Sequence, residues 1–166
     1  TASDIDQIRQ RVEENRTEIS SSDRNQIEAF WETSLNTMLL SDNARDIIAI
    51  RRQLENQMGT EPLSLYSSAY FDAAEEYLPT AFTNAARIDD ASTRRLMEQN
   101  LMVLAAKLKS PSLADFALTH IDTQDPVVRY WAVKALTNAG VIQMLSSDIT
   151  ADQEVQTRIL EALKTR

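Results

Sequence analysis

The apolar residues in the first third of this chain recur at intervals of three and four. The first stripe consists of Ile5, Ile8, Val12 and Ile19. Asn15 interrupts this stripe, and a wider apolar face follows over 27–39. Residues at such intervals lie on one face of an α-helix, so the pattern predicts three helices before residue 59. The candidates for capping the first and third of them are Ser3, Asp4, Ser41 and Asp42.

Glycine and proline mark the boundaries of the next elements. Gly59 is expected to end the third helix, because glycine adopts the left-handed conformation without a Cβ clash. Pro62 suits the first turn of a following helix. Pro79 lacks an N–H group and its ring clashes with the preceding turn, so that helix is expected to end or kink near Tyr77. Further helices are expected over 82–88, 92–108, 111–121 and 126–138, with a last one at the C-terminal end.

No segment has the pattern of a β-strand. Runs such as "IIAI" lie inside longer helical patterns, and no Asn-Gly or Asp-Gly hairpin signal occurs. The chain has only 2 glycines and 4 prolines, which favours long helices and short connections. The fold class predicted is all-α, with about seven to nine helices.

One segment recurs along the second half of the chain. The stretch "DPVVRYWAVKAL" at 125–136 aligns with 152–163 and with 90–101. Each copy opens with an aspartate, carries an apolar stripe and has a leucine eleven residues after the aspartate. Asp125 is also expected to cap its helix and to pair with Arg129 one turn later. The copies start 35 and 27 residues apart, and such offsets are typical of stacked helical hairpins.

Residues 110–140, "SPSLADFALTHIDTQDPVVRYWAVKALTNAG", resemble a HEAT repeat. The resemblance rests on a turn with proline, a turn with Asp125, and the pairs Val128-Arg129 and Ala135-Leu136. It is clear over 110–140, fair over 141–166, where Gln156 stands in place of the arginine, and weak before residue 110. It implies a right-handed α–α superhelix, a HEAT/armadillo-like solenoid, with an irregular helical N-terminal part.

The resemblance also suggests how the chain is organised. Residues 1–88 would form a helical region packed on the solenoid, and residues 89–166 would form the HEAT-like repeats. We expect one continuous domain. The final helical pattern has no cap behind it, so we also expect a longer parent protein that continues past Arg166.

The composition narrows the function classes. The formal net charge of −8 repels phosphate backbones, which argues against nucleic-acid binding. The absence of cysteine excludes disulfides, thiolate nucleophiles and cysteine-ligated metals. No stretch approaches the roughly 18 to 20 apolar residues that span a bilayer, so membrane insertion is not expected. Neither composition nor motif indicates a compartment.

No motif points to catalysis. His120 is the only histidine, and the adjacent acid pairs, such as Glu75-Glu76, do not face each other on a helix. Two glycines cannot build a phosphate-binding loop. We therefore expect no catalytic residue, no cofactor and no metal, and we expect Trp31 and Trp131 to lie in the core.

Two groups of residues are candidates for binding a partner. The aromatic group consists of Tyr66, Tyr70, Phe71 and Tyr77, for which core packing with hydroxyls at the surface is favoured over a binding patch. The second group lies off the apolar arc of the repeated helix. It consists of Tyr130, Lys134 and Thr137 with their equivalents Thr157, Glu161, Lys164, Arg95, Gln99 and Met102.

The favoured function is a non-catalytic protein–protein interaction scaffold built from HEAT-like repeats, with protein partners and no nucleic acid. An alternative is a helical dimerisation or structural module, in which the stripe over 5–19 pairs with a copy of itself in a homodimer. A further alternative, which the resemblance implies, is an enzyme of the lyase or glycosylase type on a helical-repeat scaffold. The acidic balance and the lack of cysteine argue against it.

Overall fold

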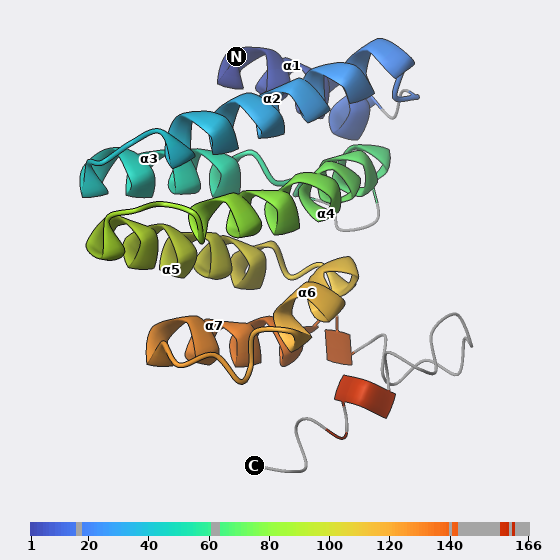
Figure 1. The fold of residues 1–166 in the computed structure, drawn as a ribbon. Coiled ribbons are helices and arrows are strands. Elements are labelled where there is room, and N and C mark those ends of the chain that lie inside the picture. Colours follow the sequence, from blue (N-terminus) through green and yellow to red (C-terminus); the bar gives the residue numbers. More distant parts are fainter. Residues whose placement is uncertain (16–17, 61–63, 140, 143–156, 160, 162–166) are drawn as a thin grey trace. The chain divides into compact units, whose positions relative to one another are not determined.

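The fold is all-α in a computed structural model that describes residues 1–15, 18–60, 64–139, 141–142, 157–159 and 161. Its elements are α1 (Ala2–Asn15), α2 (Ser21–Leu39), α3 (Ala44–Asn56), α4 (Leu65–Ala85), α5 (Ala91–Leu108), the 3₁₀ turn η1 (Pro111–Leu113), α6 (Ala114–Leu118) and α7 (Pro126–Leu136) (Figure 1). No strand occurs in these described ranges, so the predicted fold class is confirmed. None of the described helices is long and apolar enough to cross a membrane.

The chain divides into two compact units, Thr1–Leu101 and Met102–Arg166. The division falls inside α5 and not at residue 88, before the expected repeats. In the first unit α2 packs against α1, α3 and α4, and α1 also contacts α4 (Figure 1). The fully buried side chains of α2 include Ile27, Trp31 and Met38.

The narrow stripe of α1 is part of this core. Ile5, Ile8 and Val12 are each at most 5% exposed. Burying such a side chain stabilises a fold by about 1.5–3 kcal/mol, so α1 is held by its own chain. Ile19 lies beyond the end of α1 and is half-buried. The stripe is therefore occupied within the chain, and the alternative that it pairs with a second copy stays a prediction.

The first and third helices start at residues other than the expected caps, and the second, for which no cap was predicted, starts after Ser20. α1 begins at Ala2, ahead of Ser3 and Asp4. Ser20 caps α2 through a capping box, in which its hydroxyl accepts from the Asp23 N–H at 3.2 Å and the Asp23 carboxylate accepts from the Ser20 N–H at 2.8 Å. Asn43 caps α3 by accepting from the Arg45 N–H at 2.9 Å, in place of Ser41 or Asp42.

Pro79 does not end its helix. α4 runs from Leu65 to Ala85 through the proline. The buried residues Leu78, Ala81 and Ala85 continue the inner face of α4 past Pro79, so packing outweighs the lost hydrogen bond. The predicted end near Tyr77 is therefore wrong.

Gly59 has a different role from the one expected. α3 already ends at Asn56, and no described glycine has a positive φ. A Cβ at Gly59 would lie 2.0 Å from the Ser67 hydroxyl oxygen and 2.5 Å from Oε1 of Glu13. Glycine is needed here because neighbouring side chains approach the backbone closely.

A polar contact joins α3 to α5 within the first unit. Nε of Arg51 donates to the amide oxygen of Asn100 at 3.0 Å, and the Arg51 guanidinium also pairs with Glu55. Asn100 is 8% exposed, and its Nδ2 donates to the Leu96 carbonyl at 2.8 Å. This buried amide is therefore hydrogen-bonded through both its oxygen and its nitrogen, which fixes the position of α5 relative to α3.

In the second unit α6 packs against α7. Oδ1 of Asp125 caps α7 by accepting from the N–H groups of Val127 at 2.8 Å and Val128 at 3.1 Å, and Pro126 occupies the first turn. The predicted cap is confirmed. The buried face of α7 consists of Val128, Ala132, Ala135 and Leu136.

Candidate interaction surface

The aromatic group of α4 belongs mainly to the core. Tyr66 and Tyr70 are fully buried, and their hydroxyls donate to the carbonyls of Gln57 and Leu54, both at 2.6 Å. The ring of Tyr70 lies 5.2 Å from that of Trp31. Burial raises the pKa of both tyrosine hydroxyls. These hydroxyls do not reach the surface, so Tyr66 and Tyr70 form no exposed binding patch.

The other two aromatic candidates, Phe71 and Tyr77, are half-buried. Partial desolvation of Tyr77, followed by the nearby carboxylates of Glu76, Glu32 and Glu28, raises the pKa of its hydroxyl. Tyr77 therefore faces an acidic surface of α2 and α4 and is separate from the buried tyrosine pair.

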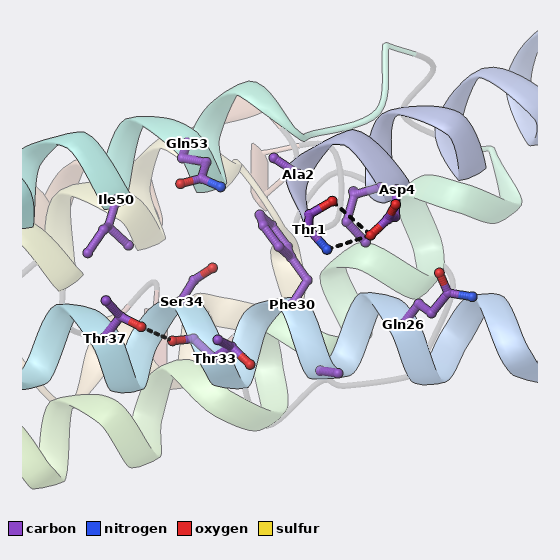
Figure 2. A pocket seen from close by; sticks show the side chains of 12 residues that line it. Thr1, Ala2, Asp4, Gln26, Phe30, Thr33, Ser34, Thr37, Ile50 and Gln53 are labelled. Carbon is purple, nitrogen blue, oxygen red and sulfur yellow. Dashed lines mark hydrogen bonds and ion pairs between the residues drawn. The ribbon is translucent and has the colours of Figure 1, made fainter.

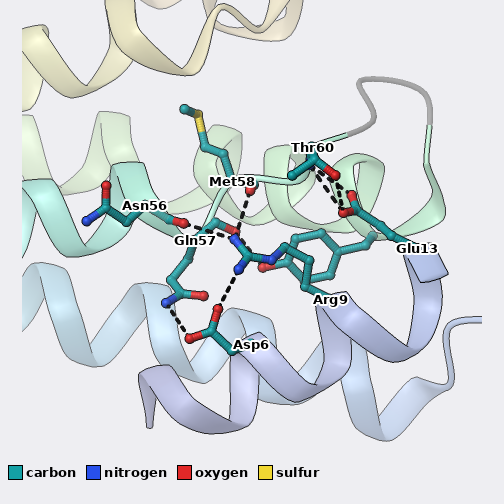
Figure 3. A network of polar contacts seen from close by, with 8 residues as sticks. Asp6, Arg9, Glu13, Asn56, Gln57, Met58 and Thr60 are labelled. Atoms are coloured by element: carbon teal, nitrogen blue, oxygen red, sulfur yellow. Dashed lines mark hydrogen bonds and ion pairs between the residues drawn. The ribbon is translucent and has the colours of Figure 1, made fainter.

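A polar network joins α1 to the segment after α3 (Figure 3). Arg9 donates to the Asp6 carboxylate at 2.6 Å and to the carbonyls of Asn56 at 2.9 Å and Met58 at 3.2 Å. Glu13 accepts from the Thr60 hydroxyl at 2.8 Å. A hollow of about 470 Å³ lies beside this network. Because these charged groups are already bonded to the protein, the network serves to fasten α1.

A second hollow, of about 510 Å³, lies among α1, α2 and α3 (Figure 2). Ile5, Phe30 and Ile50 provide its large apolar side chains, and the polar lining consists mainly of uncharged threonine, serine and glutamine. Asp4 is the one lining residue with a titratable side chain. Its carboxylate accepts from the Thr1 ammonium group at 2.7 Å and from the Thr1 hydroxyl at 2.8 Å.

The described residues also contain no cluster of three or more His, Cys, Asp or Glu that could hold a metal ion. His120 is half-buried at the end of α6, where its Nδ1 lies 2.8 Å from the Phe116 carbonyl oxygen and 2.9 Å from the Thr119 hydroxyl. These are the contacts of a histidine that helps to complete a helix end.

The outer face of α7 exposes aromatic and basic side chains. Tyr130 is 54% exposed, and Lys134 and Thr137 are also exposed. The Tyr130 ring meets the Trp131 ring edge-on, with 5.3 Å between centroids and 82° between planes. Nζ of Lys134 lies 5.7 Å from the Tyr130 centroid. Nζ of Lys107, from the last turn of α5, lies 5.8 Å from the Trp131 centroid.

These four side chains form what we call the lysine–aromatic surface: Lys107, Trp131, Tyr130 and Lys134. Trp131 is half-buried, so its expected place in the core is wrong, whereas Trp31 is fully buried as predicted. The sequence pattern missed both Lys107 and Trp131 as surface candidates. Trp131 lies beside the apolar arc of α7, and Lys107 lies on another helix, so only the folded arrangement brings them together.

The charge around this surface is unusual for the chain. Residues 1–101 contain ten Lys and Arg and eighteen Asp and Glu, whereas 102–166 contain seven of each, so the net charge of −8 belongs to 1–101. Pro126–Leu136 includes Arg129 and Lys134 and no carboxylate. Within the described ranges neither Lys107 nor Lys134 has a carboxylate within ion-pair distance.

The remaining candidates are spread along the chain. Arg95 is exposed and Gln99 is half-buried, both in the part of α5 that belongs to the first unit. Met102 is fully buried, so its expected position off the apolar face is wrong. Thr157 and Glu161 are exposed, and Lys164 lies outside the described residues. Of the predicted set, Tyr130 and Lys134 are the pair that the structure brings into contact.

Comparison of the chain with protein-family models, with curated proteins and with solved structures found no match. The physical character of the lysine–aromatic surface is therefore the main ground for assigning a function.

Proposed function

We propose that this chain is a non-catalytic protein-interaction module built from HEAT-like helical repeats, and that a protein partner binds the lysine–aromatic surface. The observation that carries the proposal is the contact between the exposed ring of Tyr130 and the half-buried ring of Trp131, with a lysine that has no carboxylate partner in the described ranges against each ring. The repeat similarity of 125–136 and the packing of α6 on α7 support the HEAT-like part of the proposal.

Tyrosine and tryptophan side chains at a surface can contribute strongly to the free energy of binding a partner. They present a large apolar area with few rotatable bonds, and they are enriched among the residues that dominate protein interfaces. Tyr130 makes no contribution to the buried face of α7, where Val128, Ala132, Ala135 and Leu136 lie. The stability of α7 therefore does not require an aromatic side chain at position 130.

The test separates binding from folding. In a variant with Tyr130→Ala and Lys134→Glu, the free energy of unfolding should fall by no more than about 1–2 kcal/mol, which is the contribution of the Lys134–Tyr130 and Tyr130–Trp131 contacts, because neither side chain belongs to the buried face of α7. Capture of a partner in a pull-down should fall strongly. Arg45→Glu provides the control, since Arg45 is an exposed residue of α3 and the substitution changes the charge by the same amount. Capture that is equal in both variants and the wild type would overturn the proposal.

A further inference from the structure

We infer that the lysine–aromatic surface binds an acidic segment of a partner protein, in which carboxylates flank an apolar side chain. This inference rests on the proposed function and deepens it, since it specifies the chemistry of the partner. A row of four contacting side chains supports this inference. Lys107 lies against Trp131, Trp131 contacts Tyr130, and Tyr130 contacts Lys134.

The two lysines are the first part of the argument. Each Nζ lies within 6 Å of a ring centroid, at 5.8 Å for Lys107 and 5.7 Å for Lys134. At an exposed site this contact stabilises the lysine by about 0.5–1 kcal/mol, which holds the ammonium group near the ring. Both charges lack a carboxylate partner in the described part of the chain, and an ammonium group has three donors. A carboxylate from another molecule can accept from each lysine without displacing one of the protein's own.

The rings supply the second part. Tyr130 and Trp131 lie edge to face between the two lysines, and Val127 on the same helix is 38% exposed. A segment that places carboxylates against both lysines must cross this apolar area. An apolar side chain between its acids would then be buried against the rings, at roughly 25 cal/mol per Å² of area removed from water.

The charge balance favours an acidic protein over the other polyanions. Binding of nucleic acid generally involves several phosphate contacts from Lys and Arg, and recognition of anionic lipid typically needs a cluster of four to eight basic residues. The face of α7 provides only Arg129 and Lys134, with Lys107 from α5. The whole chain carries a net charge of −8, which opposes any extended polyanion. A short acidic segment needs only the local charges.

The experiment uses the full chain and two synthetic peptides. The probe is a short fluorescein-labelled peptide in which glutamates flank a single leucine, and its matched control replaces each glutamate with glutamine. Fluorescence anisotropy should show binding of the acidic peptide and at least about fivefold weaker binding of the neutral one, since each exposed ion pair contributes up to about 1 kcal/mol. The affinity should fall as salt rises.

Variants of the full chain locate the site. Lys107→Glu and Lys134→Glu should each weaken binding of the acidic peptide by about fivefold or more, and the two Lys→Gln variants should weaken it less. Arg45→Glu should leave binding of the acidic peptide within about twofold, because Arg45 is a residue of α3 and does not belong to the lysine–aromatic surface. Circular dichroism checks that each variant is as helical as the wild type. Equal weakening in Arg45→Glu and Lys134→Glu would overturn the inference, because the effect would then come from total charge.

The outcomes distinguish this inference from the proposed function. If neither peptide binds, but the Tyr130→Ala and Lys134→Glu variant still loses its partner in the pull-down, the interaction surface stands and its acidic specificity is wrong. If the acidic peptide binds every variant equally, the lysine–aromatic surface is not its site and the acidic-segment inference fails, whereas the pull-down still decides the proposed function. Tighter binding of a single-stranded oligonucleotide, or of vesicles that contain phosphatidylserine, would also overturn the acidic-protein inference.

Discussion

Asp23 shows how one residue connects two helices. Its carboxylate accepts hydrogen bonds from the guanidinium of Arg11 in α1 at 2.5 Å and from the Ser20 hydroxyl at 2.6 Å. The side chain is only 8% exposed. Burial opposes ionisation, but the hydrogen bonds and the charge of Arg11 outweigh it and lower the pKa of this carboxyl below its ordinary value. Asp23 therefore both starts α2 and fastens α1 to it.

Replacing Asp23 with asparagine should lower the free energy of unfolding at pH 7 by about 1–2 kcal/mol, because a charge-assisted cap and the ion pair are lost. The contribution of a carboxylate with a lowered folded-state pKa is complete above its unfolded pKa, near 3.9, and is lost as the pH falls through the lower folded value. Urea denaturation of wild type and variant should thus give a constant difference from pH 7 to about 5 and a smaller one below about pH 4.

Asp42→Asn is the control for this series, because Asp42 is exposed between α2 and α3. Its effect should stay within about 0.5 kcal/mol at every pH. A difference for Asp23→Asn that is the same at pH 3 and pH 7 would show that the charge of the carboxylate is not what stabilises the fold.

At single positions the sequence predicted local interactions better than distant ones. Asp125 caps α7 as expected, since the N–H groups that donate to its carboxylate belong to Val127 and Val128, two and three residues later. Core packing of Tyr70 was predicted, but the burial of its hydroxyl was harder to foresee, because that hydroxyl donates to the carbonyl of Leu54 on another helix. Gly59 is a similar case. The side chains that exclude a Cβ there come from Glu13 and Ser67, which only the tertiary fold brings near.

At the scale of elements, the helical periodicity predicted which helices form but not where α4 ends. The pattern assigned a break near Tyr77 because proline is unfavourable inside a helix. The apolar residues of α4 continue on one face beyond Pro79, with Ala81 and Ala85 both buried. Tertiary packing of that face keeps the helix intact past Pro79, and helix propensity does not take such packing into account.

Pro79→Ala should stabilise the protein. Alanine supplies an N–H that can donate to the Glu75 carbonyl and removes the ring clash, for which an interior proline costs about 3 kcal/mol. The gain is reduced by about 0.4–1 kcal/mol, because the unfolded chain becomes more flexible without proline. Thermal and urea denaturation should therefore show a net gain of about 2–2.5 kcal/mol.

The matched variant is Pro126→Ala, at the first turn of α7. An N–H at that position has no partner within the helix, so this substitution should give no gain and a small loss. A stabilisation of the same size in both variants would mean that the position of Pro79 inside α4 has no special effect.

At the scale of the whole molecule, charge and tryptophan content divide between the two units. The net charge of −8 belongs to residues 1–101, and each unit contains one tryptophan. Trp31 is fully buried in the first unit, whereas Trp131 is half-buried in the second beside Lys107. Composition alone gave an acidic protein, and it could not reveal that Lys107 lies against the indole ring of Trp131 and Lys134 against the neighbouring ring of Tyr130. The HEAT-like stacking of the repeats stays a prediction.

Collisional quenching of tryptophan fluorescence can measure this local potential. After the quenching by each ion is divided by its quenching of free N-acetyl-tryptophanamide, iodide should quench wild-type emission roughly two to three times more efficiently than caesium, because Lys107 and Lys134 attract the anion to Trp131. Trp131→Phe should remove most of the quenching by either ion, since Trp31 is 0% exposed. Combining Lys107→Gln with Lys134→Gln should bring iodide quenching close to the caesium level at low salt, and added salt should do the same in the wild type. Equal quenching of the wild type by the two ions would mean that the lysines do not make the surroundings of Trp131 positive, and the electrostatic basis for an acidic partner would then be lost.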